Sequence, residues 1–285
     1  MTKAKLSGQK VRDLRSAYPD LDPDPDYPPL EFKSLKGKVS AAEWATRVDC
    51  ACAYRLVRIF GMDDIIYNHI SARIPGTEEF LLNPMGLMYD EICASSLIKV
   101  DLKGRVLWQP EFPKGLPYQF NPAGFVIHGA IHEAKPELHC VLHTHSLATM
   151  AVSSLEPGLL PMTQTAMRFT KVAYHDSEGV VLDDAERVRL LANLGDCEVM
   201  LLRNHGVLAV GRTVAEGFNN LYKIERACRT QLMAQGGGDR IRLPSAAVIE
   251  KTNHVYRPEV RRRYGLLEWP AMRRLADRVD PSYKV

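Results

Sequence analysis

The sequence predicts an α/β fold whose sheet is not purely parallel. Segments with helical spacing of apolar residues alternate with short strand-like runs. Two pairs of these runs are separated only by tight turns, around Lys103-Gly104 and around Asn204-His205-Gly206. A tight turn joins antiparallel strands, whereas parallel strands need a long crossover. Because no G-x-G-x-x-G opens a helix after a strand and no P-loop is present, nucleotide cofactors are not predicted.

The chain is predicted to have three parts: an N-terminal arm over residues 1–38, a main domain over 39–238 and a basic C-terminal extension over 239–285. In the arm, aspartates alternate with Leu21, Pro23, Pro25 and Tyr27. Proline fixes φ and removes donors, so an extended conformation is expected, either wrapped on a partner subunit or mobile. The extension is expected to be irregular, with a solvated run of arginines at 261–263.

The main domain is predicted to begin with a helix. Ser40 and Glu43 form a capping box, helical spacing of apolar residues follows, and Gly61 ends the helix. Strand-like pieces then extend from about residue 65 to 107, the clearest being EEFLLNP and the hairpin LIKVDLKGRVL.

A second helix is expected from Asn121, a good N-cap followed by Pro122 at the first helical position. A buried strand over 138–142 should then end at His143. The remaining expected elements are a short helix over 146–154, a helix over 180–196, a hairpin with the sequence VMLLRNHGVLAVG, and a long helix from the capping box at Thr213 to Gly236.

Composition narrows the class of protein. The 285 residues are 46% hydrophobic and 25% charged, as in a globular protein, and the net charge of +3 is too balanced to predict nucleic-acid binding. No apolar run approaches the ~20 residues of a membrane span, and the N-terminus lacks the apolar region of a signal peptide. A cytoplasmic location is therefore expected, with the six cysteines reduced.

Three histidines suggest a metal site. His143 and His145 are two residues apart, so on a continuing strand both side chains project to the same side. His205 lies at the tip of the later hairpin. Three neutral imidazoles leave open positions on a divalent ion, which is typical of a catalytic site. Imidazole ligation suits zinc, iron, cobalt, nickel or copper, so the spacing does not name the metal.

The sequence resembles the class II aldolase/adducin family in HCVLHTHSLATMAVSS, LPMTQTAMRFTKVAYHDSEG and VMLLRNHGVLAVGRTVAEGFNNLYKIERAC, with YNHISARIPG and LLNPMGLMYDEI matching upstream. The resemblance covers about residues 38–235. It implies a three-layer α/β/α sandwich with a central, mainly antiparallel sheet. It also implies a divalent metal on His143, His145 and His205, and a homo-oligomer, commonly a tetramer, with active sites between subunits.

The sequence departs from the sugar-phosphate aldolases of that family. Their catalytic Glu aligns with Gly124, and the two preceding serines that hold phosphate align with Pro122 and Ala123. Their Gly-Asn phosphate loop corresponds to Tyr67-Asn68, and a later Tyr falls near 164–165. The segment NPAGFVIHGAIHEAKPELHCVLHTH is closer to adducin heads and their bacterial relatives.

These features predict a metal-dependent lyase that cleaves carbon–carbon bonds, by aldol-type or decarboxylation chemistry, in a non-phosphorylated hydroxy or keto acid. The metal is expected to be zinc, with iron, manganese, cobalt and nickel as alternatives. Candidate proton donors are His128, Tyr174 and His175; His128 has the alternative of a hydrogen-bonded core histidine, and the other two of a structural role.

The upstream loops are expected to surround the substrate, through Asn68, Ser71, Asn83 and Gly86, although the asparagines also suit turns. The alternative function is a non-catalytic adducin-like assembly module, which the missing Glu favours. An open metal position inside a cleft would favour the enzyme.

Overall fold

The computed structural model describes residues 30–112, 119–169, 171–178 and 184–285. Most of the predicted N-terminal arm lies outside these residues. The proline-rich segment and its alternating aspartates therefore stay a prediction.

The core of the fold is one eight-stranded sheet in the order β4-β3-β2-β1-β5-β8-β7-β6. Every neighbouring pair is antiparallel except β6 and β7, so the mainly antiparallel sheet is confirmed. Both predicted hairpins form, as β3–β4 and β7–β8. The strands are β1 (His69–Arg73), β2 (Glu79–Leu82), β3 (Ile98–Asp101), β4 (Val106–Trp108), β5 (Cys140–Thr144), β6 (Ala173–His175), β7 (Val199–Leu202) and β8 (Gly206–Gly211).

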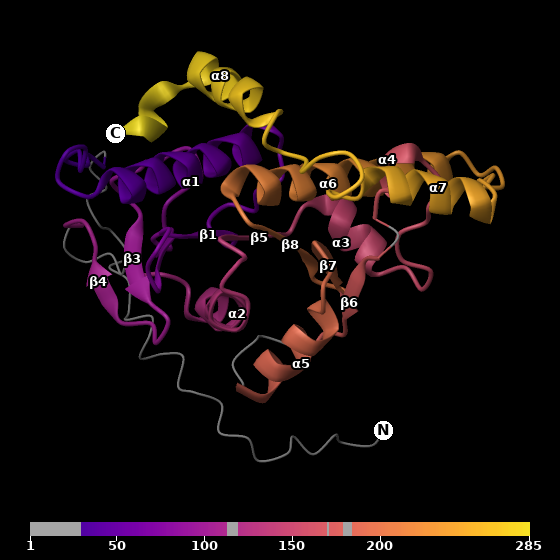
Figure 1. Cartoon of the computed structure of the whole chain (residues 1–285), viewed down its shortest axis with the longest axis horizontal. Coiled ribbons are helices and arrows are strands. Elements are labelled where there is room, and N and C mark those ends of the chain that lie inside the picture. The colour runs from indigo at the N-terminus through magenta and orange to yellow at the C-terminus, as the bar shows by residue number, and fades with distance from the viewer. Residues whose placement is uncertain (1–29, 113–118, 170, 179–183) are drawn as a thin grey trace, which may run out of the picture.

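Helices cover both faces of the sheet, which gives the expected three layers (Figure 1). One face packs against α1 (Ala41–Ile59), α3 (Leu147–Ser153) and α6 (Val214–Gly236). The other packs against α2 (Pro122–Ala134) and α5 (Asp184–Leu194). The short α4 (Gln164–Met167) packs against α6 and against α7 (Ala246–Tyr256), and α8 (Trp269–Val279) lies over α1 (Figure 1).

The helix ends follow the predicted capping signals. The Ser40 hydroxyl accepts a hydrogen bond from the Glu43 N–H at the start of α1. At its other end the N–H groups of Gly61 and Met62 bond back into the last turn, and Gly61 has a φ of +62°, as a Schellman motif requires. Asn121 caps α2 and Thr213 caps α6 in the same manner.

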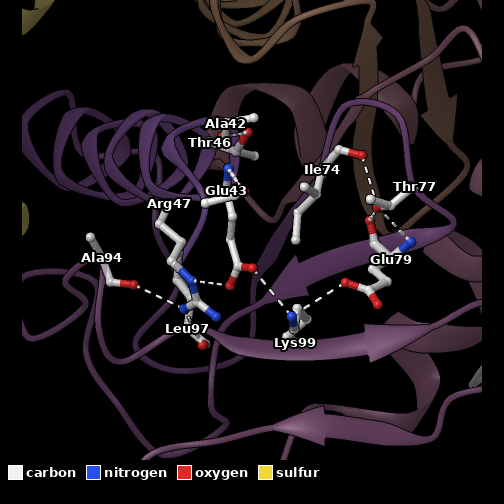
Figure 2. Close-up of polar contacts among 11 residues, drawn as sticks. Ala42, Glu43, Thr46, Arg47, Ile74, Thr77, Glu79, Ala94, Leu97 and Lys99 are labelled. Atoms are coloured by element: carbon white, nitrogen blue, oxygen red, sulfur yellow. Dashed lines mark hydrogen bonds and ion pairs between the residues drawn. The ribbon is translucent and has the colours of Figure 1, made fainter. Parts of the chain in front are cut away.

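An ionic cluster joins α1 to β3, the strand next to the edge of the sheet (Figure 2). The Arg47 guanidinium, which is fully buried, donates to the Glu43 carboxylate and to the carbonyls of Ala94 and Leu97. Lys99 on β3 reaches the same carboxylate at 3.2 Å. Removing Glu43 would leave the buried Arg47 charge without its carboxylate partner, and such a loss typically costs about 3–5 kcal/mol.

The C-terminal extension is not irregular, contrary to the sequence-based expectation. It forms α7, α8 and a short 3₁₀ helix over Pro281–Lys284. Trp269, Ala276 and Tyr283 are buried against α1, and the Trp269 indole N–H donates to Asp49. The expectation failed because the basic side chains conceal an apolar stripe at helical spacing, at positions 269, 272, 275 and 276.

Candidate metal centre

The predicted histidine triad forms where β5 ends and β8 begins. The β5–β8 register places His143 opposite Leu208 and Thr144 opposite Val207. The strand extends to Thr144, one residue beyond His143, so it carries His143 directly. At the turn, a Cβ on Gly206 would lie 2.5 Å from the Thr144 carbonyl oxygen. Glycine therefore permits the close approach that brings His205 to the other two imidazoles.

The three side chains converge through their Nε2 atoms. The Nε2 of His145 lies 2.9 Å from that of His143 and 3.0 Å from that of His205. One ligand nitrogen from each residue can be chosen so that all lie within 4.8 Å of one another. This is the predicted set of ligands, brought together from two distant segments.

The outer ring nitrogens determine which nitrogen faces inward. The Nδ1–H of His143 donates to the Val207 carbonyl at 3.0 Å, and that of His145 donates to the Asp64 carboxylate at 2.9 Å. In neutral rings both inward Nε2 atoms then carry lone pairs. Two lone pairs 2.9 Å apart repel unless a cation lies between them. The donor set therefore fits a divalent metal, with Asp64 and a carbonyl as orienting partners.

Sequence analysis did not identify Asp64. It lies in the loop after α1, 81 residues before His145. The next residue, Ile65, has a φ of +48°, which is rare for a β-branched side chain. Such backbone strain is concentrated at functional sites. The strained backbone of Ile65 marks the position of Asp64, but it is visible only in the structure and not in the sequence.

The environment keeps His143 and His205 neutral. Burial, with the neighbouring histidines, holds the pKa of His143 well below its usual range. Burial and the nearby His145 lower the pKa of His205 to about 4. Neutral imidazole is the form that binds a metal.

A chain of buried hydrogen bonds leads away from the triad. His69 on β1 lies directly opposite His143, with ring centroids 4.9 Å apart. Its Nδ1 is 2.8 Å from His128 Nε2, and His128 Nδ1 is 2.7 Å from the Ser71 hydroxyl. That hydroxyl is 2.7 Å from His132 Nε2, and His132 Nδ1 faces the Leu138 carbonyl at 3.1 Å.

The Leu138 carbonyl fixes the direction in which this series of hydrogen bonds is donated. Because a carbonyl only accepts, His132 donates from Nδ1 and accepts at Nε2 from the Ser71 hydroxyl. Ser71 in turn accepts from His128 Nδ1–H, and His128 Nε2 accepts from His69 Nδ1–H. Burial keeps the rings neutral, lowering the pKa of His132 to about 3. His69 is thereby held with a lone pair on Nε2.

His69 also occupies the space beside Gly124. A Cβ at position 124 would come within 2.6–2.9 Å of three atoms of the His69 ring. The α2 position that carries Glu in the sugar-phosphate aldolases is thus closed to a side chain while His69 stays in place. The imidazole of His69, from β1, lies beside the histidine triad instead.

The predicted substrate residues lie in different settings. Asn68 is buried just before β1, and neither its amide oxygen nor its amide nitrogen has a hydrogen-bond partner among the described residues. Asn83 accepts from the Tyr54 hydroxyl, which is a structural contact. Ser71 belongs to the histidine chain, and Gly86 occupies a loop position with a φ of +108°.

Two predicted proton donors lie on β6. The Tyr174 hydroxyl accepts from the Leu159 N–H, and its ring lies under the Arg203 guanidinium at 4.3 Å. His175 is buried; its Nδ1 accepts from the Asn193 amide. Each has structural partners, and neither belongs to the triad or to the hydrogen-bonded chain of histidines.

Comparisons with known proteins agree with this geometry. The family model described as Class II Aldolase and Adducin N-terminal domain matches residues 48–232. A Pseudomonas aeruginosa protein, named provisionally as a class 2 aldolase, is 43% identical over 88% of this chain and 96% of its own length. Alpha-adducin of Rattus norvegicus is 39% identical over 73% of this chain, which spans 29% of that protein.

Solved structures share the fold. An aldolase II superfamily protein from Pseudomonas syringae has a TM-score of 0.80 and 42% identity, covering 89% of this chain and all of its own. L-fuculose 1-phosphate aldolase from Glaciozyma antarctica has a TM-score of 0.73 and 25% identity, covering 90% of this chain and 96% of its own. No helix of the described residues is long and apolar enough to cross a membrane.

Proposed function

Because the chain belongs to the class II aldolase and adducin family, we propose that it is a metal-dependent lyase. It breaks a carbon–carbon bond, by retro-aldol or decarboxylation chemistry, in a non-phosphorylated hydroxy or keto acid. The observation that carries this proposal is the close approach of three Nε2 atoms. The Nε2 of His145 lies 2.9 Å from that of His143 and 3.0 Å from that of His205. These positions suit a cation, and three imidazoles leave it open to substrate.

His143, His145 and His205 would hold the ion, with zinc proposed first and iron, manganese, cobalt or nickel as alternatives. When bound, the metal would supply a Lewis acid that stabilises negative charge developing on a substrate carbonyl oxygen. Asp64 and the Val207 carbonyl orient two of the ligands. A homotetramer in the cytoplasm, expected from the sequence, is part of the same proposal.

We propose that His69 binds the substrate. Its Nε2 lone pair lies beside the triad, so it accepts a hydrogen bond from a substrate hydroxyl. His128 acts through His69 as a positioning residue, and Ser71 holds His128 in turn. Asn68 is retained as a substrate ligand because its buried amide lacks a partner among the described residues. An unpaired buried amide of this kind is costly unless a ligand satisfies it.

The residues at the start of α2 are the reason for proposing a substrate without a phosphate group. Where the sugar-phosphate aldolases carry two serines, this helix begins with Pro122 and Ala123, which offer no hydroxyl. A proline also lacks the N–H that a helix start would otherwise give to an anion. A carboxylate bound directly at the ion needs neither group.

Proton exchange tests this function without knowledge of the natural substrate. Pyruvate is a carbonyl acid whose methyl protons exchange with D₂O when negative charge on its oxygen is stabilised. The metal-loaded protein should accelerate this exchange, followed by ¹H NMR, and His205→Ala should abolish it. A panel of 4-hydroxy-2-keto acids and hydroxylated aromatic acids then separates aldol cleavage from decarboxylation. If loaded protein neither exchanges pyruvate nor cleaves any panel member, the lyase is refuted in favour of an adducin-like assembly module.

A further inference from the structure

A cavity of about 560 Å³ lies at the opposite end of the sheet from the histidines. It opens where β5 and β7 begin and β8 ends, whereas the triad lies where β5 ends. The five residues of β5 place the two sites roughly 15 Å apart at ~3.3 Å per residue. Part of the wall comes from the C-terminal extension, including Tyr256 and Tyr264, outside the 48–232 family match.

The most buried charge in this cavity is Arg168, which follows α4. Its side chain is 6% exposed. One terminal nitrogen donates to the Asn220 side chain on α6, and the guanidinium carbon lies 4.9 Å from the centre of the Tyr264 ring. The other terminal nitrogen, Nη1, is buried and has no hydrogen-bond partner among the described residues. Glu198 is 3.6 Å away and half exposed, a long contact for an ion pair.

Glu216 provides a buried hydrogen-bond acceptor one helical turn from Asn220. Glu216 precedes Asn220 by four residues on α6, so both lie on the same face of the helix, ~6 Å apart along its axis. One carboxylate oxygen of Glu216 accepts from the Arg212 N–H. The other is buried and has no hydrogen-bond partner in the described part of the chain, with Arg263 at 3.7 Å.

An unpaired buried polar group destabilises a protein, and more so when it is charged. A ligand that supplies one acceptor to Arg168 and one donor to Glu216 would satisfy both. Charges elsewhere on the wall nearly cancel, because three basic and four acidic side chains line the cavity besides Arg168 and Glu216. A ligand with no net charge therefore suits the cavity better than an anion does.

We propose that this cavity binds a free α-amino acid, with its carboxylate on Arg168 and its ammonium group on Glu216. Tyr256 and Tyr264, whose rings are tilted to each other with centroids 5.2 Å apart, provide an aromatic wall for the side chain. The volume lies within the usual range of small-molecule sites, about 300–1,000 Å³. The site is separate from the proposed metal chemistry and does not depend on it.

Thermal shift assays with the L-amino acids, each at about 5 mM, would identify the ligand, and calorimetry would measure its Kd. Binding raises the unfolding temperature by mass action. Glu216→Gln, which keeps the size of the side chain, should weaken binding by at least about tenfold, as should Arg168→Met. Glu250→Gln and Arg274→Met change exposed residues outside the cavity wall and should leave the Kd unchanged.

Ligand analogues test the assignment of the two charges. The N-acetyl derivative of the bound amino acid lacks the ammonium group and should lose binding to the wild type. The 2-hydroxy analogue should bind more weakly, because a hydroxyl replaces a cation beside Glu216. The proposal is overturned if no amino acid binds at 5 mM, if the hydroxy analogue binds as tightly, or if both cavity variants bind like the wild type. Metal content is unaffected by any of these outcomes, so the two sites are tested separately.

Discussion

Replacing Gly124 with alanine should destabilise the protein, although the same change in most helices is stabilising. Alanine in a helix is favoured over glycine by about 0.5–1 kcal/mol. Here the new methyl group would lie 2.6–2.9 Å from the His69 ring, far inside ordinary contact distance. The ring cannot move freely, because it is hydrogen-bonded to His128 and packed on His143. Overpacking of this kind costs about 1–3 kcal/mol, so we expect a net loss of about 1–2 kcal/mol.

A double-mutant cycle separates the clash from other effects. In a His69→Ala background the methyl group meets open space, so Gly124→Ala should become stabilising by about 0.5–1 kcal/mol. The two changes should therefore couple by about 1.5–3 kcal/mol. Urea unfolding in EDTA measures the free energy of unfolding of all four proteins without a contribution from metal binding. Equal effects of Gly124→Ala in both backgrounds would refute the claim that His69 fills the space beside this helix.

Three further predictions concern the groups around the triad. Asp64→Asn should weaken metal affinity by about 10–100-fold in a chelator competition, while Asp63→Asn leaves it unchanged. In EDTA, the free energy of unfolding of the wild type should fall as the pH drops from about 6.5 towards 3. The reason is that His132 binds a proton in the unfolded chain but stays neutral when buried in the folded protein. His132→Gln should remove up to about 1.4 kcal/mol per pH unit from that slope, and parallel slopes would contradict the buried neutral ring. Long-range ¹H–¹⁵N NMR should show His69 as the Nδ1–H tautomer in the wild type and as a mixture in Ser71→Ala; an Nε2–H wild type would disprove the direction of the chain.

Local sequence signals predicted much of the fold. The capping residues Ser40, Asn121 and Thr213 each accept the expected backbone hydrogen bonds, because a cap acts within three residues of itself. The tight turns likewise predicted antiparallel neighbours. His143 and His145 were recognisable as a pair from their spacing, although β5 ends at Thr144 and His145 lies just beyond it.

What the sequence did not reveal depends on distant contacts. The chain from His69 to His132 needs β1 to lie against α2 in one particular register, and no local pattern contains that information. Asp64 contacts a residue 81 positions away. The C-terminal helices were missed because their many charges outweighed the apolar stripe that packs on α1. The cavity around Arg168 arises between that extension and the main domain.

The most direct test of the central claim is the metal content of the untagged protein by elemental analysis. We expect about one divalent ion per chain in the wild type and strong loss in His143→Ala, since two imidazoles hold a divalent ion far less well than three. His254→Ala, which removes an exposed histidine from α7, should retain the full content. Wild-type protein without metal after resupply, or a His143→Ala variant with as much metal as the wild type, would contradict the three-histidine centre.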